Sequence, residues 1–171
     1  MNELKKIAKD LKAYTDYGHF CYNEISLYYV LAYRIARFAF LLKPKILGML
    51  LKLLSYPPYY LLSIITGIQI PLTVEVGEGL RIRHFGCIII NPSSVIGKNV
   101  TILHGVTLGI RRPNEGAPTI KDNVYVGAGA KLLGGVIVGN NAIIGANAVV
   151  LKNVPDGTTA VGVPAQIKYK K

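Results

Sequence analysis

Aliphatic residues recur at six-residue spacing through the second half of the chain. Fourteen positions carry this pattern with no polar residue among them: Ile70, Val76, Ile82, Ile88, Ile90, Ile96, Ile102, Leu108, Ile120, Val126, Leu132, Val138, Ile144 and Val150. Short repeats of this kind are typical of a β-solenoid, in which each coil buries aliphatic side chains that it could not bury alone. The pattern therefore predicts a mainly β fold of stacked coils over residues 68–165.

The six-residue grid is broken at two places. It slips by two residues between Ile88 and Ile90, next to the segment 91–94, and this slip lengthens one coil. One hexad is missing between Leu108 and Ile120, where a polar loop with Pro and Gly takes its place. Because loops that interrupt a regular scaffold commonly carry binding groups, we expect functional residues near both breaks.

Residues 1–67 lack the grid and carry apolar residues at helical spacing. We expect Asn23 to cap a helix that continues through Phe38 and that Pro44 interrupts. Pro57 and Pro58 lie within the next apolar stretch, so two short helices are expected there rather than one helix across a membrane.

The sequence leaves open whether the apolar faces of these helices pack on the solenoid, on sister subunits or in a membrane interface. Packing within an oligomer is favoured, because such stripes usually form core. Peripheral contact with a membrane is the alternative. It is favoured by cations and tyrosines in this stretch, namely Lys43, Lys45, Lys52, Tyr56, Tyr59 and Tyr60. A basic tail, residues 166–171, ends the chain.

Composition narrows the class of protein. The 171 residues suffice for one domain with an appendage, and 20 Lys and Arg against 9 Asp and Glu give a net charge of +11. That balance predicts attraction to anionic ligands, phosphates or membrane surfaces.

Cys21 and Cys87 are far apart and support neither a disulfide framework nor a zinc site. With no export signal near the N-terminus, we expect a cytoplasmic protein.

Two of the three histidines occupy the same place in a hexad. His84 and His104 are twenty residues apart, one lengthened coil, so they are expected on neighbouring coils at one corner, about 4.8 Å apart. An imidazole near neutral pKa is the usual general base for a hydroxyl, and the alternative is that both are plain turn residues. His19 is expected to take no part. A metal enzyme of this fold would need three converging histidines, so no metal is expected.

Four segments carry a resemblance to a known family: residues 79–86, 100–109, 118–131 and 161–165. On these strings the chain resembles the hexapeptide-repeat acyltransferases, in particular their serine acetyltransferase-like branch. The resemblance implies a left-handed parallel β-helix, a homotrimer, acetyl-CoA bound between neighbouring subunits, and direct acetyl transfer to a hydroxyl with a histidine as base. No nucleic acid partner is expected.

The same resemblance assigns His84 to the catalytic histidine of the family, with His104 beside it. Serine acetyltransferases have Asp, Asp and His where this chain has Gln69, Arg83 and Ala117. Because Arg83 would repel the ammonium of serine, we expect a sugar hydroxyl of capsule, exopolysaccharide or lipopolysaccharide biosynthesis as acceptor, with Arg83 and Asn91 as candidate contacts. Serine O-acetylation in cysteine biosynthesis is the alternative, and a non-catalytic membrane-docking scaffold is the alternative from another class.

The resemblance also marks positions for acetyl-CoA. Small residues would let the pantetheine arm lie against the backbone, and cations would bind the phosphates, although solvated surface charge is an equal explanation for the cations. The candidates are Gly109, Arg111, Arg112, Ala128, Ala146, Lys152 and Lys168.

Overall fold

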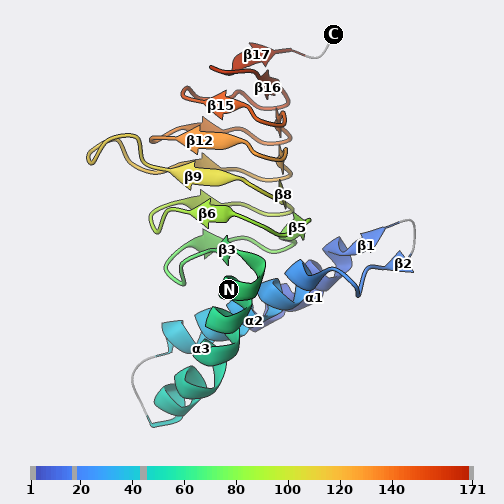
Figure 1. The fold of residues 1–171 in the computed structure, drawn as a ribbon, viewed down its shortest axis with the longest axis vertical. Coiled ribbons are helices and arrows are strands. Elements are labelled where there is room, and N and C mark those ends of the chain that lie inside the picture. The colour runs from blue at the N-terminus through green and yellow to red at the C-terminus, as the bar shows by residue number, and fades with distance from the viewer. Residues whose placement is uncertain (1–2, 17–18, 43–45, 170–171) are drawn as a thin grey trace.

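The computed structural model describes residues 3–16, 19–42 and 46–169. A tall β-solenoid forms most of the molecule, and helices from the N-terminal third gather at the end where the solenoid begins (Figure 1). The predicted parallel β-helix with an N-terminal helical segment is therefore confirmed.

Three parallel sheets run along the solenoid. The first sheet contains β3 (Ile68–Gln69), β6 (Ile88–Ile90), β9 (Thr107–Gly109), β12 (Lys131–Leu133) and β15 (Val149–Val150). The second contains β4 (Glu75–Val76), β7 (Val95–Ile96), β10 (Thr119–Ile120) and β13 (Ile137–Val138). The third contains β5 (Arg81–Arg83), β8 (Thr101–Leu103), β11 (Tyr125–Val126), β14 (Ile143–Ile144) and β16 (Thr159–Val161), and β17 (Gln166–Lys168) pairs antiparallel with β16.

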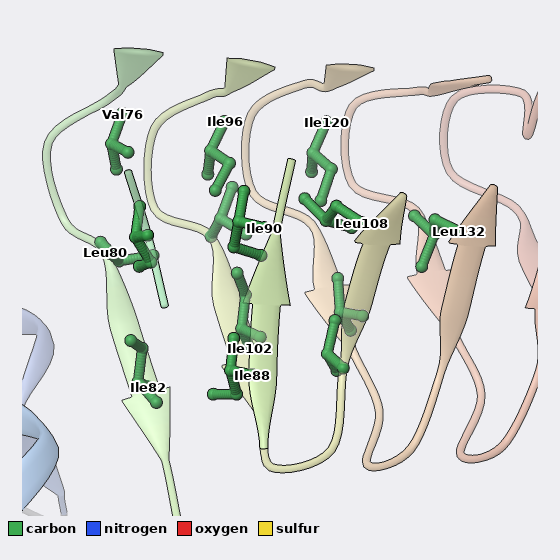
Figure 2. Close-up of a cluster of buried hydrophobic side chains, with 14 of the residues drawn as sticks. Val76, Leu80, Ile82, Ile88, Ile90, Ile96, Ile102, Leu108, Ile120 and Leu132 are labelled. Carbon is green, nitrogen blue, oxygen red and sulfur yellow. The ribbon is translucent and has the colours of Figure 1, made fainter. Parts of the chain in front are cut away.

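The grid residues form the core of the solenoid. All fourteen are at most 2 % exposed, and side chains from successive coils stack along the interior (Figure 2). Burying a side chain of this size contributes roughly 1.5–3 kcal/mol relative to exposure. The alternation of inward aliphatic and outward polar positions therefore fixes the strand register.

The two-residue slip lies elsewhere than the sequence predicts. Ile82 pairs with Ile102 and Ile90 with Leu108, so the segment from Ile82 to Ile90 is two residues longer than its partner. The extra residues belong to the turn 84–87, which joins β5 to β6, and not to 91–94. The prediction was wrong because Ile88 and Ile90 both point inward from β6, two positions apart, and this mimics a shifted grid.

The N-terminal helices depart from expectation in several details. Helix α1 (Glu3–Ala13) lies in the segment 1–67 predicted to be helical, although no particular helix was expected at these positions, and a two-stranded hairpin, β1 (Thr15–Asp16) and β2 (His19–Phe20), follows it. Helix α2 (Ile25–Leu41) has Glu24 as its N-cap, with no side-chain cap hydrogen bond, so the expected Asn23 cap is wrong. The expected interruption at Pro44 lies outside the described residues.

Helix α3 (Ile46–Thr66) is one continuous helix that contains Pro57 and Pro58, which contradicts the two short helices expected there. A proline cannot donate to the carbonyl four residues before it, here Leu53 and Leu54. Both leucines and both prolines are exposed, so this turn lies on the outer side of the helix, while Tyr59 anchors the next turn in the core. No helix among the described residues has the length and apolarity that spanning a bilayer requires.

Polar side chains from the helices complete the hydrogen bonds of the first coil, which has no preceding coil to pair with. The Tyr33 and Tyr59 hydroxyls donate to the Val74 and Ile70 carbonyls at 2.7 and 2.8 Å. Asp10 accepts from the amides of residues 79 and 80, and Arg34 binds Asp10 at 2.7 Å and donates to the Val76 carbonyl at 2.9 Å. The helices therefore act as a cap that satisfies buried backbone groups.

Candidate functional site

The histidine pair lies at the corner between the third and first sheets. His84 follows β5 and His104 follows β8, and these strands are neighbours in register. The ring centroids are 6.2 Å apart with an interplanar angle of 71°, and both side chains are exposed. The predicted placement on neighbouring coils at one corner is confirmed.

The longer turn shapes the first half of this corner. His84 and Cys87 both have positive φ, 58° and 50°, and Gly86 lies between them at 129°. The Gly86 carbonyl accepts a hydrogen bond from the Gly105 amide at 2.8 Å, which ties the turn of the first coil to that of the second. Histidine tolerates this backbone region better than most side chains, so the turn presents an imidazole where a bulkier residue would be strained.

Strand β5 is held in place by the helices, and sequence reasoning missed this support. The Ile82 carbonyl accepts from Ser26 Oγ at 2.6 Å, and the Ile82 amide donates to Tyr14 Oη at 3.1 Å. Burial is the main cause that raises the pKa of Tyr14 to about 12, so its hydroxyl stays protonated at neutral pH. An ion pair at 3.4 Å joins Arg81 to Glu24. No local pattern marks these residues, because their partners are distant in sequence.

Lys131 is a second residue that sequence reasoning did not assign to the site. It extends from β12 toward the second-coil turn, where its Nζ donates to the Gly105 carbonyl at 2.6 Å and to Thr107 Oγ1 at 3.1 Å. The side chain is half-buried. Its ammonium group therefore lies against Gly105, the residue that follows His104, at the same corner.

Ala128 and Ala146 continue the column of turns above the histidines. The His104 carbonyl accepts from the Gly129 amide at 2.9 Å, and the Ala128 carbonyl accepts from the Asn147 amide at 2.8 Å. Ala128 is half-buried and Ala146 is exposed. A ligand lying along this corner would meet small side chains and backbone, as the sequence predicts.

Gly109 and the loop after it lie at the opposite end of the first-sheet strands. Arg111 binds Glu115 at 2.7 Å, and Arg112 approaches the same carboxylate at 3.8 Å. The hydrogen bond to Glu115 is the main cause that raises the pKa of Arg111. Two of the four cations predicted for the phosphates, Arg111 and Arg112, are therefore paired within the loop.

Two neighbouring hollows, of about 450 and 510 Å³, lie beside this loop. Arg111 and Lys152 line both, and Ile167, the neighbour of Lys168, lines the second. Of the cations predicted to bind phosphate, Arg111 and Lys152 are thus brought together at one place on the surface.

The candidate acceptor contacts do not share one place. Arg83 is the last residue of β5, directly before His84, and is half-buried. Asn91 follows β6 at the far end of that strand, about 13 Å of extended chain beyond the turn 84–87. Its Oδ1 accepts from the Ser93 amide at 3.0 Å, so the side chain closes a local turn. The structure separates Asn91 from the histidine corner that the sequence analysis grouped it with.

Among the residues that the structure describes, no three His, Cys, Asp or Glu side chains gather closely enough to hold a metal ion. His19 lies on β2, in the hairpin between α1 and α2.

Comparisons with known proteins identify relatives of this chain. A family model, bacterial transferase hexapeptide (six repeats), matches residues 117–152. The serine acetyltransferase of Helicobacter pylori strain J99 is 49% identical over 104 residues, which are 60% of this chain and 61% of that protein. The chain therefore covers about three fifths of the length of that relative.

Solved structures extend the likeness to nearly the whole chain. Neisseria gonorrhoeae serine acetyltransferase in complex with serine is 35% identical with a TM-score of 0.78, over 96% of this chain and 68% of that one. A serine acetyltransferase in complex with CoA is 29% identical with a TM-score of 0.77, over 98% and 70%. The fold and the repeats define a hexapeptide-repeat protein. The chain belongs to the hexapeptide-repeat acetyltransferase family, with serine acetyltransferases as its relatives.

Proposed function

We propose that the chain transfers an acetyl group from acetyl-CoA to a hydroxyl, and that L-serine is its acceptor. The observation that carries this proposal is the exposed pair His84 and His104, at one corner of a solenoid whose relatives are named serine acetyltransferases. The comparisons favour serine over the sugar acceptor expected from the sequence, because one related structure is a complex with serine.

In this reaction His84 acts as the general base. A neutral ring nitrogen takes the proton of the acceptor hydroxyl while the oxygen attacks the thioester carbonyl carbon. The tetrahedral intermediate then collapses, the carbon–sulfur bond breaks, and the imidazolium returns the proton to the CoA sulfur. The products are the acetyl ester and CoA with a free thiol. His104 lies close enough to share the acceptor or to serve as base itself.

Acetyl-CoA would run along the column of small residues above the histidines. Ala128 and Ala146 in this column leave backbone groups accessible to the amides of the pantetheine arm, and Gly109 does so at the opposite end of the first-sheet strands. Lys152 and Arg111 are the cations placed to meet its phosphates. We further propose that the chain works as a homotrimer in which the thioester lies between neighbouring subunits, as the family resemblance implies.

A sugar hydroxyl is the second candidate acceptor, and one observation favours it. Arg83 stands directly before the proposed base, where it would disfavour the ammonium of serine and suit a neutral or acidic sugar. Gln69 and Ala117 likewise stand where serine acetyltransferases are expected to have an acid and a histidine.

The test is CoA thiol release measured with L-serine and with neutral, amino and acidic sugars, free and nucleotide- or lipid-linked. The highest kcat/KM with L-serine supports the first candidate, and the highest value with a sugar supports the second. Release with none of these acceptors would contradict acetyl transfer and favour the scaffold alternative.

A further inference from the structure

Helix α3 buries its small and polar residues and exposes its large apolar ones. The buried positions are Gly48, Ser55, Tyr59 and Thr66, on the side that packs against α2 and β3. Outside, Ile46 is 88 % and Ile64 is 81 % exposed. A helix at the surface of a globular protein ordinarily has the opposite arrangement, so its outer side is built to meet something apolar.

Seven of the exposed residues form a band, which we call the α3 strip, and Leu47, Leu54, Leu61 and Ile65 are exposed beside it. Its members recur at three- and four-residue steps and are Ile46, Met49, Leu50, Leu53, Pro57, Tyr60 and Ile64. A hollow of about 730 Å³ runs along its first half, and a second of about 550 Å³ reaches from its tyrosines to the first coil. Tyr56 and Tyr60 line both hollows, so the apolar surface is continuous from the tip of α3 to β3.

Among the described residues, the one charged side chain that lines the hollows of the α3 strip is the cation Lys52. The sequence has no acidic residue between Glu24 and Glu75, but it has five Lys and Arg there. Arg34 and Arg37 point inward and pair with Glu3 of α1. Lys52, in contrast, lines the first hollow together with Tyr56 and Tyr60. Helix α1, which packs against α2, carries a further exposed row of cations, Lys5, Lys9 and Lys12.

We propose that the α3 strip docks the protein on an anionic membrane surface, with α3 lying in the plane of the interface. Apolar side chains bounded by tyrosines and lysines match the boundary between acyl chains and anionic headgroups. A second copy of this chain is the poorer occupant. In a two-fold contact through the strip, α3 of the second copy would offer Lys52 no acidic residue to pair with.

The position of α3 in the chain relates this docking to the histidine corner. Helix α3 ends at Thr66 and β3 begins at Ile68, so the first coil directly follows the docked helix (Figure 1). His84 belongs to this coil, and the remaining coils lead away from it. The proposed acceptor site therefore lies in the coil nearest to the docked helix.

The test is co-flotation of the purified full-length chain with vesicles at low salt. We expect recovery with phosphatidylcholine vesicles that contain phosphatidylglycerol, and much less with phosphatidylcholine alone. The double variant L53E/I64E should lose at least tenfold of the binding to anionic vesicles. The matched variant L53M/I64V keeps an apolar strip and should float like the wild type.

Circular dichroism and thiol release in the absence of vesicles show whether each variant is folded and active, which separates a failure of docking from a failure of the proposed acetyl transfer. Wild-type protein that stays with the lipid-free fraction in both vesicle types would overturn the proposal. So would flotation of L53E/I64E equal to that of the wild type. A wild type that does not float, and whose mass in light scattering exceeds that of L53E/I64E, would assign the strip to a contact between copies.

Discussion

The backbone at His84 constrains which substitutions can test its chemistry. With φ at 58°, the position favours Gly, Asn or Asp over other replacements. Asparagine keeps the turn but cannot act as a general base near neutral pH. It therefore separates loss of the base from distortion of the loop better than alanine does.

We expect His84→Asn to lower kcat by about 10²- to 10⁴-fold and to leave the KM for acetyl-CoA near its wild-type value. Steady-state kinetics with the best acceptor measure both constants. The same change at His104, which precedes Gly105 in the shorter turn, serves as the comparison. If His84→Asn turns over at the wild-type rate while His104→Asn does not, the base is His104.

The cations near the 110–118 loop differ in their surroundings, and this difference predicts unequal effects. Lys152 lines both hollows beside the loop, whereas Arg112 is highly exposed and approaches Glu115. Lys152→Ala should raise the KM for acetyl-CoA by roughly 5- to 10-fold, with little effect on kcat, because it removes a contact made equally in ground and transition states. Arg112→Ala is the control and should change the KM by less than about twofold. Equal effects of the two variants would contradict the assignment of Lys152.

At the scale of elements, the contact between α1 and the first coil depends on a buried ionic cluster. Asp10 and the Arg34 side chain are fully buried, and Glu3 and Lys6 lie beside them. Burial alone would lower the pKa of Arg34, but its hydrogen bond to Asp10 and the charges of Asp10 and Glu3 raise it overall. The guanidinium therefore stays charged and requires its partner.

Asp10→Ala should reduce the free energy of unfolding by about 3–5 kcal/mol, because it leaves the Arg34 cation buried without its main partner and frees two backbone amides. Urea denaturation followed by circular dichroism measures the change. Lys9→Ala, at an exposed position of the same helix, should stay within about 0.5 kcal/mol of the wild type. A similar small change for Asp10→Ala would show that α1 does not hold the first coil.

The elements that the sequence predicted well are the strands of the solenoid, whose buried aliphatic residues repeat every six positions. Each coil of the solenoid buries its own aliphatic residues, so the hexad pattern reported the fold and the alignment of His84 with His104. Helix α1 was missed because its buried face is charged and is satisfied by Arg34, which is distant in sequence. The site support from Tyr14 and Ser26 was missed for the same reason.

At the scale of the whole molecule, the outer sides of the sheets are partly apolar. Ile89, Val95, Tyr125 and Ile137 are each between 38 and 48 % exposed and point away from the core. These residues are available for packing between solenoids, in keeping with the proposed homotrimer.

Light scattering should therefore give three times the 18.6 kDa mass of the chain, and dilution that dissociates the assembly should abolish thiol release. The dependence arises because a thioester bound between subunits has no complete site in a single chain. An active 18.6 kDa species would contradict the proposal.

The cytoplasmic location expected from the sequence stays a prediction.

The polar cap on the first coil also makes the solenoid finite. A stack of parallel coils has no inherent length, since each coil offers the next one the same row of amides and carbonyls that it received. Here the growth is stopped at one end by hydroxyls and charges from the helices, and at the other by β17, which reverses direction against β16. Coils can therefore be added or removed between the two stops without redesigning either, and the number of repeats is a quantity that evolution or an engineer can vary independently of the histidine corner.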